Sequence, residues 1–157
     1  MVTTISLRPS EPTDEPLLYE VYASTREDEL ALVDWTDVQK AAFLRQQFSA
    51  QHSFYHDRYA HARFDLILQD GTPIGRLYVA RWPEKIHILD IALLPPYRNA
   101  GIGTGLLRAL LAEAAATGKR ASIYVERFNP ARRLYERLGF SEVADEGIYL
   151  LLECSPR

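Results

Sequence analysis

The sequence predicts one α/β domain over residues 1–157, with a mixed sheet of about seven strands and about four helices. Three observations predict this fold class. The chain has 157 residues, of which 47% are hydrophobic and 25% charged, as is typical of a single globular domain. Its apolar residues recur at helical spacing in some stretches and alternate in others. Helix-like and strand-like stretches interleave in the second half, which is the pattern of an α/β fold.

The first third of the chain predicts a strand followed by two helices. Ile5 and Leu7 alternate with polar residues before a proline ends the strand. Residues 13–22 begin with a capping side chain and an early proline and then continue at helical spacing. A second helix is predicted from Asp37 to about His52. The acidic link between the two helices contains Glu27, Asp28, Glu29 and Asp34.

The remaining elements follow from alternation and from one strongly apolar helix. Alternation from residue 62 on, with a turn at Asp70-Gly71, predicts a hairpin. Residues 86–94 form a more continuous apolar run, as expected of a central strand that is buried on both faces. The elements predicted after it are a helix over 102–116, a strand over 121–125, a helix over 129–138 and a closing hairpin over 140–143 and 148–152.

Charge is distributed unevenly along the chain. The net charge is −3, yet residues 98–137 hold eight Lys and Arg against three Asp and Glu. A basic segment within an acidic chain predicts a local anion site. Nucleic-acid binding is not expected, because it normally accompanies a basic domain.

The sequence also predicts a cytoplasmic protein without membrane association. Cys154 is the single cysteine, so no internal disulfide can form, and a lone cysteine near the end of a strand is expected to be inert. No apolar run approaches the roughly 20 residues that span a bilayer. The stretch Met1–Ile5 lacks the basic head and apolar core of a secretion signal.

The most informative stretch is the glycine-rich turn over residues 95–105, between the central strand and the 102–116 helix. Gly101 and Gly103 allow close approach to the backbone, and the first N–H groups of the helix are available to a phosphate. Arg98 adds a fixed positive charge. A turn that uses glycine for geometry alone stays open as the alternative. A dinucleotide fingerprint is excluded because Leu106 stands where the third glycine is required, and a P-loop is excluded because no Gly-Lys-Ser/Thr follows.

Two segments resemble the Gcn5-related N-acetyltransferase (GNAT) superfamily. Arg98-x-x-Gly101-x-Gly103 is similar to its Gln/Arg-x-x-Gly-x-Gly/Ala signature. The segment from Asn129 to Phe140, NPARRLYERLGF, resembles the family's Asn-x-x-x-x-Leu-Tyr-Glu-x-x-Gly-Phe segment. Together with the preceding strand, the resemblance covers roughly residues 86–141.

The resemblance implies a mostly antiparallel sheet whose strands splay apart at a coenzyme site, with acetyl-CoA as the acyl donor and no metal. The pyrophosphate would bind at the turn and the pantetheine arm along the central strand, where the Leu93 N–H would stabilise the developing charge on the thioester oxygen. The coenzyme-binding residues that it implies are Ile91, Ala92, Leu93, Arg98, Asn99, Ala100, Gly101, Ile102, Gly103, Thr104 and Asn129.

Three residues are candidates for the chemistry. The resemblance assigns Tyr135 to the departing thiolate, which a phenol can protonate or hydrogen-bond; its alternative role is packing beside Leu134 and Leu138. His87 stands where many relatives place a glutamate base, and it is a candidate base with an ordinary pKa of about 6.5. Asp90 interrupts an apolar strand and is either a second candidate base or a satisfied structural acid.

The function expected from these residues is the transfer of an acetyl group from acetyl-CoA to a primary amine of a small molecule or a peptide, in a chain that can form a homodimer. The acidic residues of the first third would suit a cationic amine, although ordinary surface solvation explains them equally well. Two alternatives stay open: a coenzyme-A-binding module without transfer activity, and an acetyltransferase acting on proteins or aminoacyl-RNA. His52 and His56 at four-residue spacing could contribute to a zinc site but are expected to be partly exposed residues just after a helix, so no metal is expected.

Overall fold

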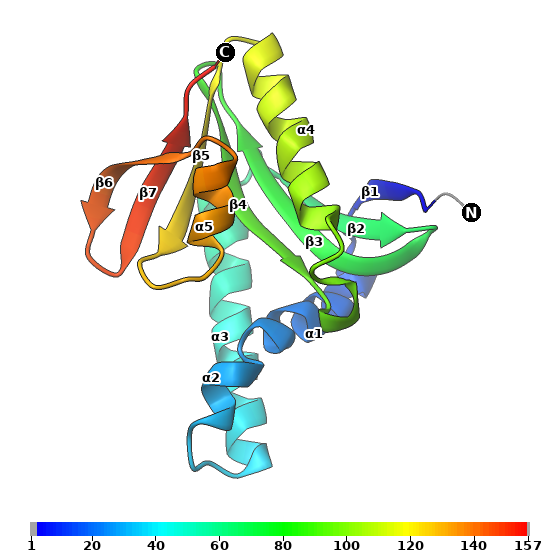
Figure 1. Ribbon diagram of the computed structural model, residues 1–157. Coiled ribbons are helices and arrows are strands. Elements are labelled where there is room, and N and C mark those ends of the chain that lie inside the picture. The colour runs from blue at the N-terminus through cyan, green and yellow to red at the C-terminus, as the bar shows by residue number, and fades with distance from the viewer. Residues whose placement is uncertain (1–2, 157) are drawn as a thin grey trace. The chain divides into compact units, whose positions relative to one another are not determined.

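A computed structural model describes residues 3–156, which form seven strands and five α-helices (Figure 1). The strands form one sheet in the order β1-β2-β3-β4-β5-β7-β6, with β4 and β5 parallel. This confirms the predicted mixed sheet. The strands are β1 (Ile5–Pro9), β2 (Arg63–Gln69), β3 (Thr72–Arg81), β4 (Lys85–Leu93), β5 (Arg120–Glu126), β6 (Ser141–Glu146) and β7 (Tyr149–Cys154). The helices are α1 (Glu15–Thr25), α2 (Glu27–Ala31), α3 (Asp37–Arg58), α4 (Ile102–Ala116) and α5 (Arg132–Arg137).

The backbone divides into two compact units. The first contains the chain up to Leu77 together with Ile91–Arg98, and the second contains Tyr78–Asp90 together with the chain from Asn99 on. The single domain over residues 1–157 therefore stays a prediction. The prediction that no secretion signal is present was made on Met1–Ile5. Met1 and Val2 of that stretch lie outside the residues that the structure describes. Between residues 3 and 156, no helix is both long and apolar enough to cross a membrane.

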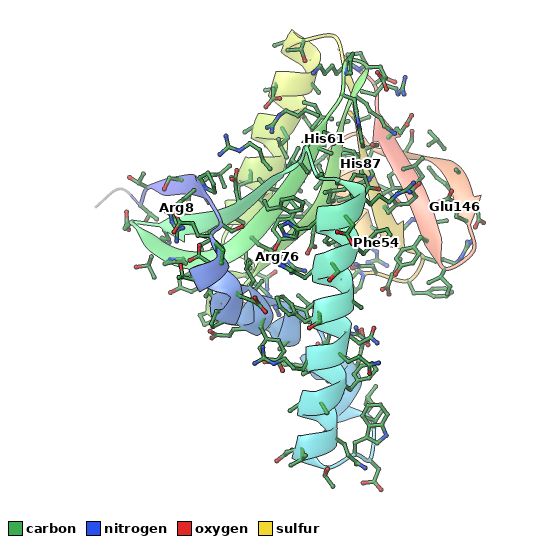
Figure 2. All side chains as sticks on the ribbon, turned by 180° about the vertical axis from the view of Figure 1, so that it is seen from behind. Arg8, Phe54, His61, Arg76, His87 and Glu146 are labelled. Carbon is green, nitrogen blue, oxygen red and sulfur yellow. The ribbon has the colours of Figure 1, made fainter. Side chains whose placement is uncertain are left out.

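In the first unit, α1 and α3 pack through aromatic side chains. Phe48 of α3 is 1% exposed and its ring contacts the rings of Tyr19 and Tyr22 on α1. Strand β1 pairs antiparallel with β2 over its whole length. Arg76 of β3 points toward α3, where its Nη2 donates to the Gln51 side-chain oxygen at 2.8 Å (Figure 2).

Helix α3 is longer than predicted, and a short helix forms in the acidic link. The predicted end of α3 at about His52 is wrong, because the helix continues to Arg58. In these last turns the half-buried His56 stacks on Phe64 of β2 with a centroid distance of 4.0 Å. Helix α2 was not predicted. Three acidic residues in its first turn favour a helix there, and Leu30 buries its side chain.

In the second unit, α4 has the predicted bounds, and Gly118 follows its end with a φ of 69°. Leu107, Leu110 and Ala114 form its buried face, and the helix packs against β5 (Figure 1). Strand β7 pairs antiparallel with both β5 and β6, which leaves β6 at the edge of the sheet.

Helix α5 begins later than predicted. The side-chain oxygen of Asn129 accepts a hydrogen bond from the Ala131 N–H at 2.9 Å, so Asn129 caps a turn rather than the helix itself. The next two N–H groups bond to carbonyls three residues earlier, which makes this turn tighter than an α-helical one. Regular helix starts only at Arg132.

Candidate functional site

The turn before α4 has the backbone conformation that an anion site needs. Asn99 and Gly101 both have positive φ, at 60° and 83°. The first backbone hydrogen bond of the helix runs from the Gly105 N–H to the Gly101 carbonyl at 3.0 Å. The N–H groups of Ile102, Gly103 and Thr104 therefore precede the helical ladder and lie at the positive end of a 15-residue helix.

The space around Gly103 is open. A Cβ added at Gly103 would meet no atom within 4 Å, and its φ is not in the left-handed region. Folding therefore does not require glycine at this position. A larger side chain would occupy the space next to the first N–H groups of α4, so a substitution here tests ligand binding rather than stability.

A pocket of about 1030 Å³ extends from this turn to the segment between β5 and β6. We call it the basic pocket. Neither Tyr135 nor Asp90 contributes to its lining. Its lining residues are Asn99, Thr104, Arg127, Phe128, Asn129, Pro130, Ala131, Arg132, Arg133, Leu134, Glu136 and Arg137.

Tyr135 is buried, at 8% exposure, and its ring packs edge-on against Phe140 at 6.0 Å. Burial raises the pKa of its phenol to about 12, with a further contribution from the negative charge of Asp90. The structure thus brings the charge of Asp90 to bear on Tyr135, and these are two of the three residues predicted to carry the chemistry. The phenol keeps its proton throughout the physiological pH range and is available as a hydrogen-bond donor.

His87 is separated from bulk solvent. It is 4% exposed on β4, its Nδ1 lies 2.7 Å from the Ser122 hydroxyl, and the Tyr124 ring meets it edge-on at 5.4 Å. Burial, together with a smaller contribution from the positive charge of Lys85, lowers its pKa to about 4. At neutral pH the imidazole is uncharged, and a group with this pKa is a weak proton acceptor.

The parallel pairing of β4 and β5 ends early. It joins Lys85–Ile88 to Arg120–Ile123, although both strands continue beyond these residues. In the first unit, β4 ends with the Leu94 N–H bonded to the Ile74 carbonyl at 2.8 Å.

The Arg98 side chain is fixed by two hydrogen bonds within the first unit. Its Nε donates to the Leu93 carbonyl at 2.9 Å and its Nη2 to the Ser24 hydroxyl at 3.0 Å. These contacts fix the end of β4 to α1. They also use two of the donors that the sequence assigned to a phosphate.

His52 and His56 were expected at or just after the end of a helix. In the structure both lie within α3. The His52 and His56 rings are 4.3 Å apart, and burial together with the neighbouring His52 lowers the pKa of His56. Among residues 3–156, no group of three or more His, Cys, Asp or Glu side chains is placed to hold a metal ion.

Two residues next to the site, Gly75 and Ser122, were not predicted from the sequence. A Cβ on Gly75 of β3 would lie 2.3 Å from the Ala92 carbonyl oxygen, so only glycine lets β3 approach the end of β4. An isolated glycine within a strand pattern is the signal that could have identified it. Ser122 lies opposite His87 in the β4–β5 register, and no sequence signal identifies such a pair.

Comparisons with known proteins agree with this arrangement. The model of the acetyltransferase (GNAT) family matches residues 18–140. An N-alpha-acetyltransferase of Sulfurisphaera tokodaii is 40% identical over 63 residues, 38% of each chain. A ribosomal protein bS18-alanine N-acetyltransferase of Haemophilus influenzae is 31% identical over 78 residues, 49% of this chain and 53% of the relative. The chain therefore matches well under two thirds of the length of these curated relatives.

The fold has many solved counterparts. The crystal structure of PaiA N-acetyltransferase from Thermoplasma acidophilum, in complex with coenzyme A, has a TM-score of 0.72 at 21% identity, over 97% of this chain and 99% of that one. An acetyltransferase from Thermus thermophilus has a TM-score of 0.70 at 22% identity, over 97% of both chains. The family model covers more than half of the chain and the fold agrees with it, so this chain belongs to the acetyltransferase (GNAT) family.

Proposed function

We propose that the protein transfers the acetyl group of acetyl-CoA to a primary amine, and that its preferred acceptor is the α-amino group of a peptide or protein. The observation that carries the proposal is the turn at the start of α4, where unpartnered N–H groups and an open Gly103 offer a site for a pyrophosphate. The family to which the chain belongs, and the coenzyme A bound to its solved counterpart, support this ligand.

The reaction is a direct transfer. The amine nitrogen attacks the thioester carbonyl carbon, the C–S bond breaks, and the coenzyme leaves as a thiolate while the nitrogen loses a proton. The backbone of Ile91, Ala92 and Leu93 would bind the pantetheine arm, with the Leu93 N–H facing the thioester oxygen. Asn129 would contact the same arm, and Arg98, Asn99 and Ala100 would join the turn in holding the pyrophosphate.

Tyr135 would stabilise the departing thiolate. Its pKa of about 12 lies well above the roughly 8.5 of a free thiol, so complete proton transfer to the sulfur is uphill. A hydrogen bond from the phenol to the sulfur carries no such penalty. We therefore assign Tyr135 the role of a hydrogen-bond donor to the leaving group.

Asp90 is the better of the two candidate bases. Its charge acts on Tyr135, which ties it to the residue assigned to the leaving group. His87 is only 4% exposed, with its Nδ1 against the Ser122 hydroxyl and its ring against Tyr124, so an incoming amine does not reach it. We assign His87 to positioning, through its contact with Ser122.

The acceptor class is supported by the names of the relatives, of which one is an N-alpha-acetyltransferase and another a ribosomal-protein alanine N-acetyltransferase. The first name specifies an α nitrogen, and the second specifies an alanine of a ribosomal protein. Acidic side chains on α2 are exposed, which suits an acceptor that carries a positive charge. A comparison of short peptides with polyamines and with aminoacyl-RNA as acceptors tests this choice.

The test of the coenzyme assignment is acetyl-CoA binding, measured by calorimetry. We expect the wild type to bind in the micromolar range, about −8 kcal/mol. Gly103→Glu should lose binding, because its carboxylate would repel the pyrophosphate, whereas the uncharged Gly103→Gln of equal size should lose less. A wild type that does not bind acetyl-CoA contradicts the proposal. Binding without acetyl transfer to any amine would instead identify a coenzyme-A-binding module.

A further inference from the structure

The Arg98 side chain joins two elements of the first unit, α1 and the end of β4, which lie side by side (Figure 1). Its Nη2 donates to the Ser24 hydroxyl at 3.0 Å, and its Nε donates to the Leu93 carbonyl at 2.9 Å. A guanidinium group is planar and rigid, so a contact that fixes one of its nitrogens also orients the others. The direction of the bond to Leu93 therefore depends on the bond to Ser24.

Ser24 is a fixed anchor for this guanidinium group. The residue is 7% exposed, and its hydroxyl donates to the Val21 carbonyl at 2.6 Å. A hydroxyl has a single proton, so its oxygen meets Arg98 as an acceptor. Both roles of the hydroxyl are thus occupied, and its orientation is set by the backbone of α1.

The peptide group between Leu93 and Leu94 is held on both sides. Its carbonyl accepts from Arg98, and its N–H, which belongs to Leu94, donates to the Ile74 carbonyl at 2.8 Å. A peptide group is planar, so these two bonds fix its orientation. Only the φ and ψ torsions of Leu93 separate it from the preceding peptide group, which carries the Leu93 N–H. The direction of that N–H therefore depends on the Arg98 contact.

We propose that Ser24 and Arg98 are positioning residues, which hold the Leu93 N–H in the direction that polarises the thioester carbonyl of acetyl-CoA. The inference rests on the proposed function, in which this N–H faces the thioester oxygen. A donor to a developing oxyanion is effective because it is oriented before the reaction begins. The two contacts use Nε and Nη2, which leaves Nη1 for the pyrophosphate role proposed for Arg98.

The test is the stretching frequency of the thioester carbonyl in bound acetyl-CoA, labelled with ¹³C at that carbon and measured by difference infrared spectroscopy. A hydrogen bond to the oxygen weakens the C=O bond, so the frequency in the wild type should be lower than in free acetyl-CoA. Ser24→Ala should lose about half of this shift or more, because the guanidinium group loses its anchor. Its affinity for acetyl-CoA, measured by calorimetry, should stay unchanged. This readout requires no acceptor amine.

Thr25→Val is the matched control. The Thr25 hydroxyl donates to the carbonyl three residues earlier at 2.6 Å, as the Ser24 hydroxyl does. Arg98 bonds to Ser24 and not to Thr25. The control therefore removes a hydroxyl with the same backbone contact from the adjacent position of α1, and it should keep the full infrared shift. Thermal unfolding of both variants checks that each keeps the fold.

Arg98→Lys separates positioning from charge. A lysine keeps the positive charge but has one compact ammonium group in place of the rigid fork, so it does not hold Leu93 and Ser24 in one orientation. Its infrared shift should fall as in Ser24→Ala. Adding Ser24→Ala to Arg98→Lys should change the shift no further, since the two residues act through one chain of contacts. Independent, additive losses would overturn the inference.

Turnover is the second measurement. With a short peptide that begins with alanine as the acceptor, Ser24→Ala should lower kcat about tenfold and leave the KM for acetyl-CoA unchanged. The loss is smaller than that expected for removal of a whole oxyanion donor, because the N–H is misaligned rather than absent. A role of Ser24 in stability alone would lower the temperature of unfolding and leave kcat unchanged.

The outcomes separate this inference from the proposed function. A Ser24→Ala variant with the wild-type infrared shift or the wild-type kcat overturns the inference. A wild type whose bound thioester carbonyl shows no shift also overturns it, and both results leave the binding of acetyl-CoA in place. If the wild type does not bind acetyl-CoA, the proposed function fails together with the inference.

Discussion

Two buried side chains of the second unit have pKa values shifted in opposite directions by the same cause. Removal from water disfavours the charged form of each, which raises the pKa of the Tyr135 phenol and lowers that of the His87 imidazole. Both groups are consequently neutral at pH 7. A neutral phenol is suited to donating a hydrogen bond, whereas a neutral imidazole with a pKa of about 4 is poorly suited to accepting a proton.

At the residue scale, Tyr135→Phe tests the assigned role in leaving-group stabilisation. The substitution removes the hydroxyl and keeps the ring that packs on Phe140, so stability should change little. We expect kcat to fall about 100-fold with the KM for acetyl-CoA unchanged, because the lost interaction acts on the departing sulfur. Steady-state measurement of coenzyme A release checks this. A rise in KM at constant kcat would mean that Tyr135 serves binding instead.

The lowered pKa of His87 predicts that the folded protein loses stability in acid. Its folded-state pKa of about 4 lies below the ordinary 6.5, so the unfolded chain takes up a proton first as the pH falls. Stability is therefore fully present above about pH 6.5 and is lost between pH 6.5 and 4, by about 3 kcal/mol from this group.

Urea unfolding at several pH values checks the His87 prediction. His87→Asn can keep the hydrogen bond to Ser122 without the titration, so its stability should fall less steeply over the same pH range. His56, whose pKa is also lowered, remains in the variant and leaves a residual slope. Identical slopes in the two proteins would contradict the prediction.

At the scale of elements, the end of β4 depends on a glycine in its neighbour β3. The backbone around Gly75 leaves no room for a side chain, because a Cβ would lie 2.3 Å from the Ala92 carbonyl oxygen and 3.1 Å from the Leu93 Cα. Both obstacles are backbone atoms, which cannot rotate away. The residues proposed to bind the pantetheine arm are thus positioned by a residue that does not bind it.

Gly75→Ala should destabilise the protein by about 2–3 kcal/mol, since β3 and β4 must separate to admit the methyl group. Gly105→Ala is the matched control. It lies in α4 with nothing within 4 Å of an added Cβ, so the same substitution there should stabilise by about 0.5–1 kcal/mol. Chemical denaturation measures both changes. An equally stable Gly75→Ala variant would show that the strands can separate without cost.

At the scale of the whole molecule, the charge of the basic segment is partly neutralised by the acidic strand that follows it. Asp145 and Glu142 of β6 pair with Arg127 and Arg132, which the sequence alone counted as available cations. The local excess of positive charge is therefore smaller than the count over residues 98–137. Among residues 3–156, Arg133 and Arg137 are in no ion pair.

Acetyl-CoA should stabilise the folded chain as a whole. A ligand that binds only the native state at 100 times its Kd contributes about 2.7 kcal/mol. For a chain of this length the Tm should rise by roughly 5–10 °C. Thermal unfolding with and without acetyl-CoA checks this, with Gly103→Glu as the control that should show no shift. A shift of equal size in that variant would place binding away from the turn before α4.

Much of the fold was predictable because its patterns are local. Alternation, helical spacing and glycine positions identified all seven strands and the bounds of α4. The errors occurred where a contact distant in sequence determined the outcome. In the last turns of α3, His56 meets Phe64, and neither residue predicts the other.

The sequence by itself determined the family, through the turn motif and the segment that contains Tyr135, because such motifs encode local backbone geometry and a chemical group together. Only the tertiary structure decided the state of the groups involved. Burial set the pKa values of Tyr135 and His87, strand register paired His87 with Ser122, and ion pairing selected which arginines remain available. These properties depend on distance and on exclusion of water, and both arise only when residues remote in sequence are packed together.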